Sequence, residues 1–382
     1  MAGLGIGAFI VVLILVIVVH EAAHFGVARL FDIKVTEFFV GFGPKLWSRM
    51  RGETEVGVKA IVAGGYVKIA GMNPYETIAP EDLPRTFGAK PIWQRALVIG
   101  AGPATHFALA FVFFALWLGL VGEPTDAKPV LSDVCARIGG TPVSGEDCTT
   151  IGGVPGPAFE AGLVPGDEIA AIGGVERPTG DEIIAVTQDN VGRPLAVTVL
   201  RDGQEVSVTV VPVLVEEDGE ATARLGVVLS PGRQTVGPVG AVTGGVDLVW
   251  DNLVGTVRGV ARIFGPEGIG RLFELVFTDE PRAPEDPASV VGVGAVAGNI
   301  ASEGRFGDLL VLFGLVNVFV GFLNLLPLPP FDGGHLAVLV IEKIRHRPVD
   351  MRRVAPISAA VAAFFILFTL AVVYVDLVKP PV

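Results

Sequence analysis

Four stretches of the chain are almost free of charged side chains and are long enough to cross a bilayer. They are Leu4–His24, Trp93–Val121, Leu309–Leu326 and Val354–Val375. Each approaches the roughly 20 residues that a helix needs to span about 30 Å of hydrocarbon. The pattern predicts a polytopic α-helical membrane protein with about four membrane-spanning helices. The first stretch differs from a signal peptide because no basic region precedes it and no small-residue cleavage site follows it.

The first two apolar stretches are separated by short β-branched and aromatic runs that alternate with glycine, from Phe38 to Gly71. This alternation predicts a β-hairpin or small sheet. Bare sheet edges are not stable in lipid. We therefore expect the hairpin to be covered by protein or to dip only shallowly into the membrane.

The long middle region has the pattern of a water-exposed α+β domain between about Ile151 and Ser230. Apolar and polar residues alternate on both sides of Asp202-Gly203, which is a strong hairpin signal. After this domain, Val246–Phe277 has apolar residues at helical spacing, interrupted by the letters FGPEGIG. It predicts two short amphipathic helices, which lie either on the outer membrane surface or against the water-exposed domain.

Composition and charge support a membrane protein and suggest its orientation. Hydrophobic residues make up 51% of the chain, and the mean hydropathy is +0.61. Lysine and arginine concentrate between the first and second spans and between the third and fourth, whereas the middle region is acidic. The positive-inside rule then places both basic loops in the cytoplasm and the middle region outside. A net charge of −12 argues against nucleic-acid binding.

The chain has two cysteines, Cys135 and Cys148, both at the start of the outer region. An oxidising compartment permits a disulfide between them. Two unpaired thiols are the alternative.

Candidate chemistry begins where the first apolar stretch ends, with His20, Glu21 and His24 in the pattern H-E-x-x-H. Residues four apart lie on one face of a helix, so two imidazoles can bind one zinc ion. The glutamate can take a proton from water that the zinc acidifies. Ionisable groups in a membrane helix are costly, and their default interpretation is functional. The alternative is a pair of interfacial histidines that reach toward water.

A catalytic zinc usually has three protein ligands, and Asp332 is the candidate for the third. It follows a proline-rich break in the third apolar stretch, where an irregular backbone must be buried in protein or line a watery cavity. Asp332 could instead cap the following helix. His335 is a rival ligand.

Together, H-E-x-x-H and N-x-x-P-x-P-x-x-D-G-G-H resemble the site-2 proteases, which are intramembrane zinc metalloproteases. The resemblance covers nearly the whole chain. It is nearest to the bacterial PDZ-containing branch that includes the regulator-of-sigma-E proteases. Within this branch, the chain resembles the shorter actinobacterial type with a single PDZ domain. It implies that His20, His24 and Asp332 bind zinc and that Glu21 is the general base. It also implies that Asn324 and Pro327 hold an unwound substrate, and that the hairpin around Gly65 and Tyr66 is membrane-reentrant and pairs with the substrate.

The resemblance further implies a function and a domain layout. The expected reaction is cleavage of single-span membrane proteins, such as anti-sigma factors or signal peptides, in regulated intramembrane proteolysis after an upstream site-1 protease has acted. The expected protein is a multi-pass plasma-membrane protein with a cytoplasm-side active site and an extracytoplasmic PDZ-like domain. The expected divisions are 1–121, 122–232 for the PDZ-like domain, 233–306 for the amphipathic helices and loop, and 307–382.

Two positions depart from the family pattern. Phe331 precedes Asp332 where leucine is common, and His106 stands where relatives have asparagine. His106 could keep a polar packing role or approach the metal. A non-catalytic scaffold with a degenerate metal site and a zinc transporter are the alternatives to a protease. The transporter is disfavoured because the fourth span offers few metal-binding groups.

Overall fold

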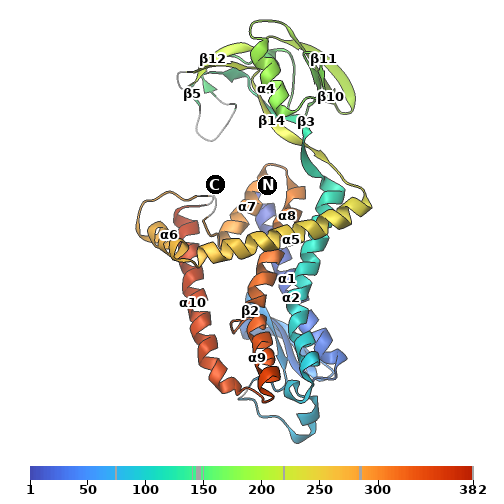
Figure 1. Ribbon diagram of the computed structural model, residues 1–382, viewed down its shortest axis with the longest axis vertical. Coiled ribbons are helices and arrows are strands. Elements are labelled where there is room, and N and C mark those ends of the chain that lie inside the picture. Colours follow the sequence, from blue (N-terminus) through green and yellow to red (C-terminus); the bar gives the residue numbers. More distant parts are fainter. Residues whose placement is uncertain are drawn as a thin grey trace. The chain divides into compact units, whose positions relative to one another are not determined.

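The structure is a computed structural model that describes residues 1–73, 75–139, 141–142, 148, 150–217, 220–283 and 286–380 (Figure 1). The chain divides into two compact units. One contains residues 1–120 and 237–382, and the other contains residues 121–236. The second unit is therefore inserted between two parts of the first.

Four helices of the first unit are long and apolar enough to cross a membrane, which confirms the predicted number of spans. They are α1 (Ala2–Leu30), α2 (Ile92–Leu116, extended by a π-helical turn to Val121), α8 (Leu309–Leu325) and α10 (Met351–Val378). Both chain termini lie at the same end of this unit (Figure 1), as an even number of spans requires.

A shorter apolar helix, α7 (Val290–Ser302), packs against the start of α1. Gly5 permits this close approach, because a Cβ atom there would lie 2.6 Å from Cβ of Ala301. Small residues commonly allow membrane helices to pack this tightly. With 13 residues, α7 is too short to be found by a search for spans.

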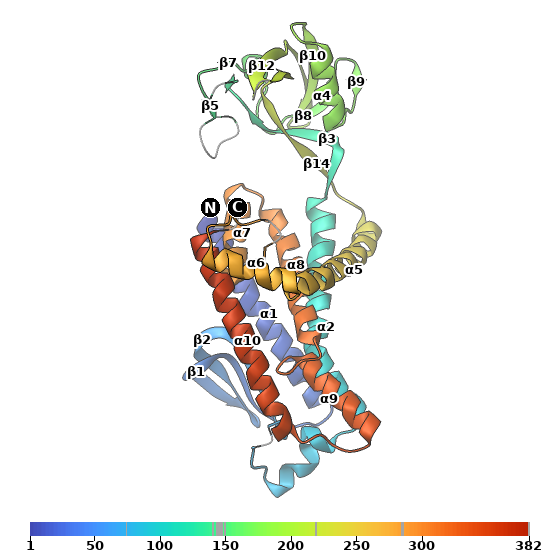
Figure 2. The ribbon, with the colours of Figure 1, turned by 60° about the vertical axis from the view of Figure 1, so that its left-hand side comes forward.

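Two helices run across the spans rather than along them (Figures 1 and 2). They are α5 (Pro238–Ile263) and α6 (Pro266–Phe277), so the two predicted amphipathic helices exist. The first begins eight residues earlier than expected. It packs on α2 and α8, a contact with membrane helices that neither predicted alternative included.

The predicted hairpin is also confirmed, as β1 (Val35–Arg51) and β2 (Thr54–Ile69). It folds back on itself, so that Glu37–Val40 pairs with both 65–68 and 55–58. Residues 65–69 form one edge of this sheet, and β2 packs beside α1 (Figure 2). The far part of the hairpin is exposed, with Trp47 59% accessible.

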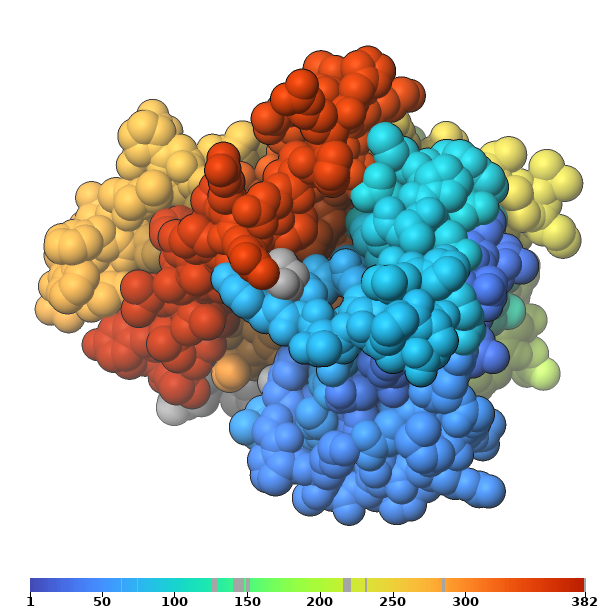
Figure 3. Space-filling view, turned by 90° about the horizontal axis from the view of Figure 1, so that it is seen from below, coloured from blue at the N-terminus to red at the C-terminus, as the bar shows by residue number. Residues whose placement is uncertain are grey.

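The remaining elements of the first unit gather at the end opposite the termini (Figures 1 and 3). A buried cluster there joins α1, the hairpin, α2 and α9 through Ala28, Ile69, Val98 and Leu339. These elements are α9 (Asp332–Arg345) and the short 3-10 helices η1 (Pro80–Arg85) and η2 (Phe87–Ala89). Another 3-10 helix, η4 (Phe306–Asp308), directly precedes α8 and is not part of this group.

The inserted unit is an α+β domain with a sheet of strand order β11-β10-β8-β3-β14, to which β9 adds beside β8. Its predicted hairpin turns at Asp202 and Gly203, both with positive φ, as the Asp-Gly signal requires. Its strands are β3 (Glu123–Val134), β8 (Glu168–Ile172), β9 (Val175–Glu176), β10 (Leu195–Arg201), β11 (Gln204–Val210) and β14 (Val227–Gln234).

The described residues of this unit also form two helices and three small strand pairs. Helix α4 begins at a capping box in which Thr179 and Glu182 satisfy each other's backbone N–H groups. The elements are α3 (Pro157–Glu160), α4 (Gly180–Asp189), β4 (Arg137–Ile138) with β7 (Val154–Pro155), β5 (Thr141–Pro142) with β6 (Thr150–Ile151), and β12 (Val213–Glu217) with β13 (Glu220–Arg224).

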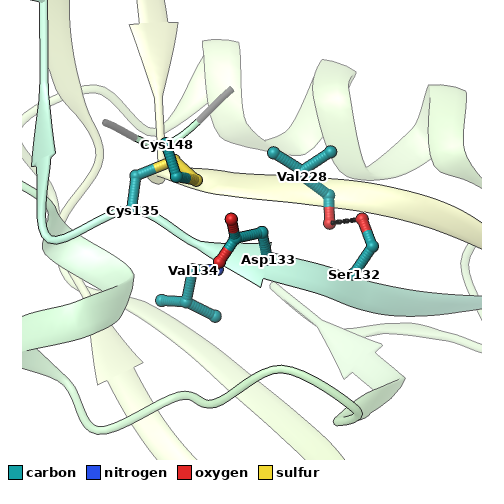
Figure 4. The surroundings of a disulfide bond; sticks show 6 residues. All are labelled: Ser132, Asp133, Val134, Cys135, Cys148 and Val228. Atoms are coloured by element: carbon teal, nitrogen blue, oxygen red, sulfur yellow. Dashed lines mark hydrogen bonds between the residues drawn. A yellow bond between two sulfur atoms is a disulfide. The ribbon is translucent and has the colours of Figure 1, made fainter. Parts of the chain in front are cut away.

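Cys135 and Cys148 form a disulfide, which decides between the two alternatives left open by the sequence (Figure 4). The bridge lies at the end of β3, next to β14. There the Ser132 hydroxyl donates a hydrogen bond to the Val228 carbonyl at 3.0 Å. Cys135 belongs to a small buried cluster with Ile138 and Val215.

Candidate metal centre

The last turns of α1 place the H-E-x-x-H motif inside a membrane-spanning helix but near its end. His24 lies six residues before Leu30, which is about 9 Å along a helix. His20 and His24 are one turn apart, and their ring centroids are separated by 4.8 Å. The two Nε2 atoms are 3.2 Å apart and therefore face the same point.

Asp332 reaches this point from the other end of the sequence. Its Oδ2 atom lies 3.4 Å from Nε2 of His20 and 3.4 Å from Nε2 of His24. Asp332 is the first residue of α9, and Phe331 at the N-cap makes no side-chain capping bond. The structure thus brings the predicted third ligand to the two histidines. The predicted rival, His335, is not in this group.

The three groups fit a zinc ion. Tetrahedral zinc with bonds of about 2.0–2.1 Å holds its ligand atoms about 3.3 Å apart, close to the 3.2, 3.4 and 3.4 Å found here. Oδ2 of Asp332 is buried and has no hydrogen-bond partner among the described residues. A buried carboxylate oxygen without a donor is costly unless a cation satisfies it.

A backbone carbonyl orients one of the two histidines. Nδ1–H of His24 donates to the carbonyl of Val98 in α2, at 2.8 Å. This bond places the proton on Nδ1 and leaves the Nε2 lone pair directed at the cluster, which is the usual outer partner of a metal-binding histidine.

Helix α2 also packs directly on both imidazole rings, at Gly102. A Cβ atom at this position would lie 2.6 Å from Cε1 of His20 and closer still to Nε2 of His24. Only glycine allows α1 and α2 to approach at this level.

His106 lies one turn further along α2, with its ring centroid 4.9 Å from that of His20. It is 2% exposed. Its Nδ1–H donates to Oδ1 of Asn317 in α8 at 3.1 Å, and the Asn317 amide in turn donates to the Phe313 carbonyl. The sequence left open a polar packing role and an approach to the metal. The hydrogen bond to Asn317 supports the packing role, and His106 is not in the metal-binding group.

Glu21 faces the hairpin edge. A Cβ atom on Gly65 would come within 3.0 Å of Cγ of Glu21, and the backbone of Val67 also lies near its carboxylate. The general-base candidate therefore stands between the metal-binding group and the edge strand 65–69.

The other substrate-binding candidates differ in how free their side chains are. The Tyr66 hydroxyl donates to Glu37 and accepts from Lys59, so its side chain is bound within the hairpin and only its backbone remains for a substrate. Burial, reinforced by Glu37, raises the pKa of Tyr66 above its usual range, and the same bond lowers the pKa of Glu37. Asn324 is half-buried near the end of α8, and Pro327 is exposed in the loop that leads to Asp332.

Two glycines after Asp332 explain how that loop can turn into α9. A Cβ atom on Gly334 would lie 2.6 Å from Cα of Pro329, and one on Gly333 would overlap the backbone of Leu325. The chain therefore folds back tightly, which directs Asp332 toward α1.

Val98, Gly102 and Asn317 were not singled out from the sequence. Val98 acts through its backbone carbonyl, which no side-chain pattern reveals. Gly102 lies in a run of small residues, which favours close helix packing but does not identify what packs there. Asn317 does carry a sequence signal, because an amide in the middle of an apolar span requires a hydrogen-bond partner.

Comparisons with known proteins agree with this geometry. The family model described as Peptidase family M50 matches residues 8–369. Zinc metalloprotease Rip1 of Mycolicibacterium smegmatis is 33% identical over 405 residues, covering 100% of this chain and 98% of the relative. Zinc metalloprotease Rip1 of Mycobacterium tuberculosis is 32% identical over 403 residues, covering 98% of each chain. The chain belongs to peptidase family M50, the site-2 proteases, and is a multi-pass membrane zinc metalloprotease.

Proposed function

We propose that this protein cleaves single-span membrane proteins within or next to their membrane segment, with His20, His24 and Asp332 as the zinc ligands. The observation that carries this proposal is that Asp332 of α9 meets the two histidines of the membrane-spanning helix α1 at one point. Zinc bound there supplies a Lewis acid that acidifies water and polarises a peptide carbonyl.

Glu21 is the general base in this proposal. It adjoins the metal-binding group in α1 and can take a proton from the attacking water and deliver it to the leaving amine. Its position beside Gly65 supports a role next to a peptide bound along the hairpin edge.

The hairpin edge supplies the substrate-binding surface. Within the described residues, 65–69 pairs with β1 on one side only. An unwound substrate can add to the other side as a further strand, through backbone hydrogen bonds. Gly65 and the backbone of Tyr66 lie on this edge, and the amide of Asn324 and the proline loop at Pro327 would hold the substrate from the side of Asp332.

The active site faces the cytoplasm in this proposal. Most basic residues of the first unit fall in two stretches between the spans, Arg29–Lys90 and Lys343–Arg353. The loops of these stretches lie at the end of the unit opposite the termini. The positive-inside rule places this end in the cytoplasm and the inserted unit outside.

The inserted unit acts as a PDZ-like domain. A cavity of about 310 Å³ is lined by residues of α4, including Ile183 and Thr187, and by Val227–Leu229 of the edge strand β14. A groove between a helix and a strand edge suits an added peptide strand. The unit either excludes substrates with bulky outer domains, which a site-1 protease must first trim, or recruits trimmed ones. Deletion of residues 151–230 gives unregulated cleavage in the first case and lost cleavage in the second.

The natural substrates are of the anti-sigma-factor or signal-peptide type in this proposal. Both are single membrane segments that become accessible after their outer part is removed, which suits a membrane-embedded site joined to an outer domain.

The central test replaces Glu21 by glutamine in the full-length protein. General-base catalysis contributes about 10²–10⁴-fold, so cleavage of a model single-span substrate should fall by at least about 100-fold while zinc content stays at the wild-type level. Glu160→Gln, at an exposed position of α3, is the matched control and should cleave normally. Wild-type cleavage by Glu21→Gln would remove Glu21 from the mechanism.

A further inference from the structure

A buried ion pair joins two helices that are far apart in the sequence and both border the metal-binding group. Nη1 of Arg95 in α2 donates to Oε2 of Glu342 in α9 at 2.8 Å, across 247 residues. The two side chains are only 14% and 9% exposed. The pair lies at the end of the first unit where the start of α2 and the end of α9 meet, the region seen in Figure 3.

The pair anchors the C-terminal end of α9. Glu342 is ten residues after Asp332, so it anchors the helix about 15 Å from the metal-binding carboxylate. The other oxygen of Glu342 accepts the backbone N–H of Val349 at 2.9 Å, which ties down the segment that follows α9.

The same turn of α2 also orients a metal ligand. Arg95 and Val98 are three residues apart, and the Val98 carbonyl accepts the bond that sets the His24 ring. One turn of helix therefore binds α9 through Arg95 and α1 through Val98.

Apolar packing alone defines the position of α9 poorly. Leu339 and Leu336 of α9 pack in the buried cluster that includes Val98 of α2, but Val340 is 56% exposed. A cavity of about 530 Å³ remains beside these residues and the start of α2. The fold-back at Gly333 and Gly334 holds only the start of α9, and the ion pair opposes a tilt of the helix about that point. A tilt would move Oδ2 of Asp332 away from the 3.4 Å that separates it from both histidines.

We infer that Arg95 and Glu342 are positioning residues: their ion pair sets how α9 lies against α2, and thereby brings Oδ2 of Asp332 to His20 and His24. The inference rests on the proposed function, in which these three side chains bind zinc. Neither residue of the pair is among the metal-binding group itself.

The test compares two neutralising substitutions at buried ion pairs of the first unit. Glu342→Gln removes the charge facing Arg95. Asp376→Asn is the matched control, because Asp376 near the end of α10 is paired at 2.6 Å with buried Arg282. Within the described part of the chain, its bonds go to Arg282, Ser289 and Gly292 and not to the metal-binding group. Both changes keep the side-chain size, and both should lower the melting temperature of the full-length protein.

Metal affinity separates the two variants. If the loss of the pair moves Asp332 away from the histidines, Glu342→Gln should bind zinc at least about 10-fold more weakly in competition with a chelator, a difference of about 1.4 kcal/mol. The absorption spectrum of its Co²⁺-substituted form should also shift. Asp376→Asn should match the wild type in both measurements. Wild-type metal affinity in Glu342→Gln, or equal losses in the two variants, would overturn the inference.

A double variant and a ligand variant complete the design. In Arg95→Met with Glu342→Leu, apolar side chains replace the buried pair, a change that often restores stability. Metal affinity should stay at least about 10-fold below the wild type, and full recovery would show that the pair contributes stability alone. Asp332→Ala tests the underlying assignment: if it keeps wild-type zinc affinity, the proposed ligand set is wrong, whatever the pair does.

Discussion

Gly102 is the position where a single added methyl group should disturb the metal centre most directly. It lies on α2 where that helix faces both metal-binding histidines. In Gly102→Ala, the new Cβ would lie 2.6 Å from Cε1 of His20 and also 2.6 Å from Cε1 of His24.

The size of the effect follows from these distances. Carbon atoms pack at about 3.5–4.0 Å, so the alanine is about 1 Å too close to both rings. Metal–ligand distances tolerate only about 0.2 Å, and the rings cannot move by 1 Å and still bind zinc well. Overpacking of this kind costs about 1–3 kcal/mol. If the strain is relieved by moving the histidines, zinc affinity falls about 5–150-fold.

Gly100→Ala provides the matched control on the same helix. A Cβ atom at Gly100 meets no atom within 4 Å, and alanine is about 0.5–1 kcal/mol better than glycine in a helix interior. Zinc affinity by chelator competition, and cleavage of a single-span substrate, should both fall in Gly102→Ala and stay normal in Gly100→Ala. Equal zinc affinity in the two variants would refute the packing argument, because α2 would then not constrain the histidines.

Two further predictions concern the inserted unit and the helix interior. Asp167→Asn removes the ion pair with Arg201. Because Arg201 holds the pKa of Asp167 below its usual value, the pair stabilises the wild type above about pH 4, and this stabilisation disappears as the pH falls further. The difference in unfolding temperature between wild type and Asp167→Asn should therefore vanish in acid, and a pH-independent difference would contradict this. His106→Leu leaves the buried Asn317 carbonyl oxygen without its donor and should lower the unfolding free energy by about 1–3 kcal/mol, measured by denaturation in detergent; an unchanged stability would show that the hydrogen bond contributes nothing.

Local patterns predicted the elements of this protein well. The four spans, the hairpin after α1, the turn at Asp202 and Gly203, and the two histidines of α1 all depend on residues close in sequence. Asp332 was found from a distance only because its proline-rich surroundings in an apolar stretch are chemically unusual.

Long-range contacts could not be predicted in the same way. Glu342 looks like an ordinary charge on the exposed side of an amphipathic helix, and nothing local connects it to Arg95. The fold-back of the hairpin, which places Glu37–Val40 between two other segments, also depends on bends whose direction the sequence pattern does not specify. Helix α7 was missed because Val290–Ser302 is apolar but short.

The most direct test of the metal centre is zinc X-ray absorption spectroscopy on the full-length protein in detergent, with the zinc content measured on the same sample. One zinc per chain is expected, with nitrogen and oxygen ligands at about 2.0–2.1 Å, a two-imidazole signature, and no sulfur at about 2.3 Å. The absence of tightly bound zinc, or a coordination shell without two imidazoles, would contradict the convergence of His20, His24 and Asp332 on a catalytic ion.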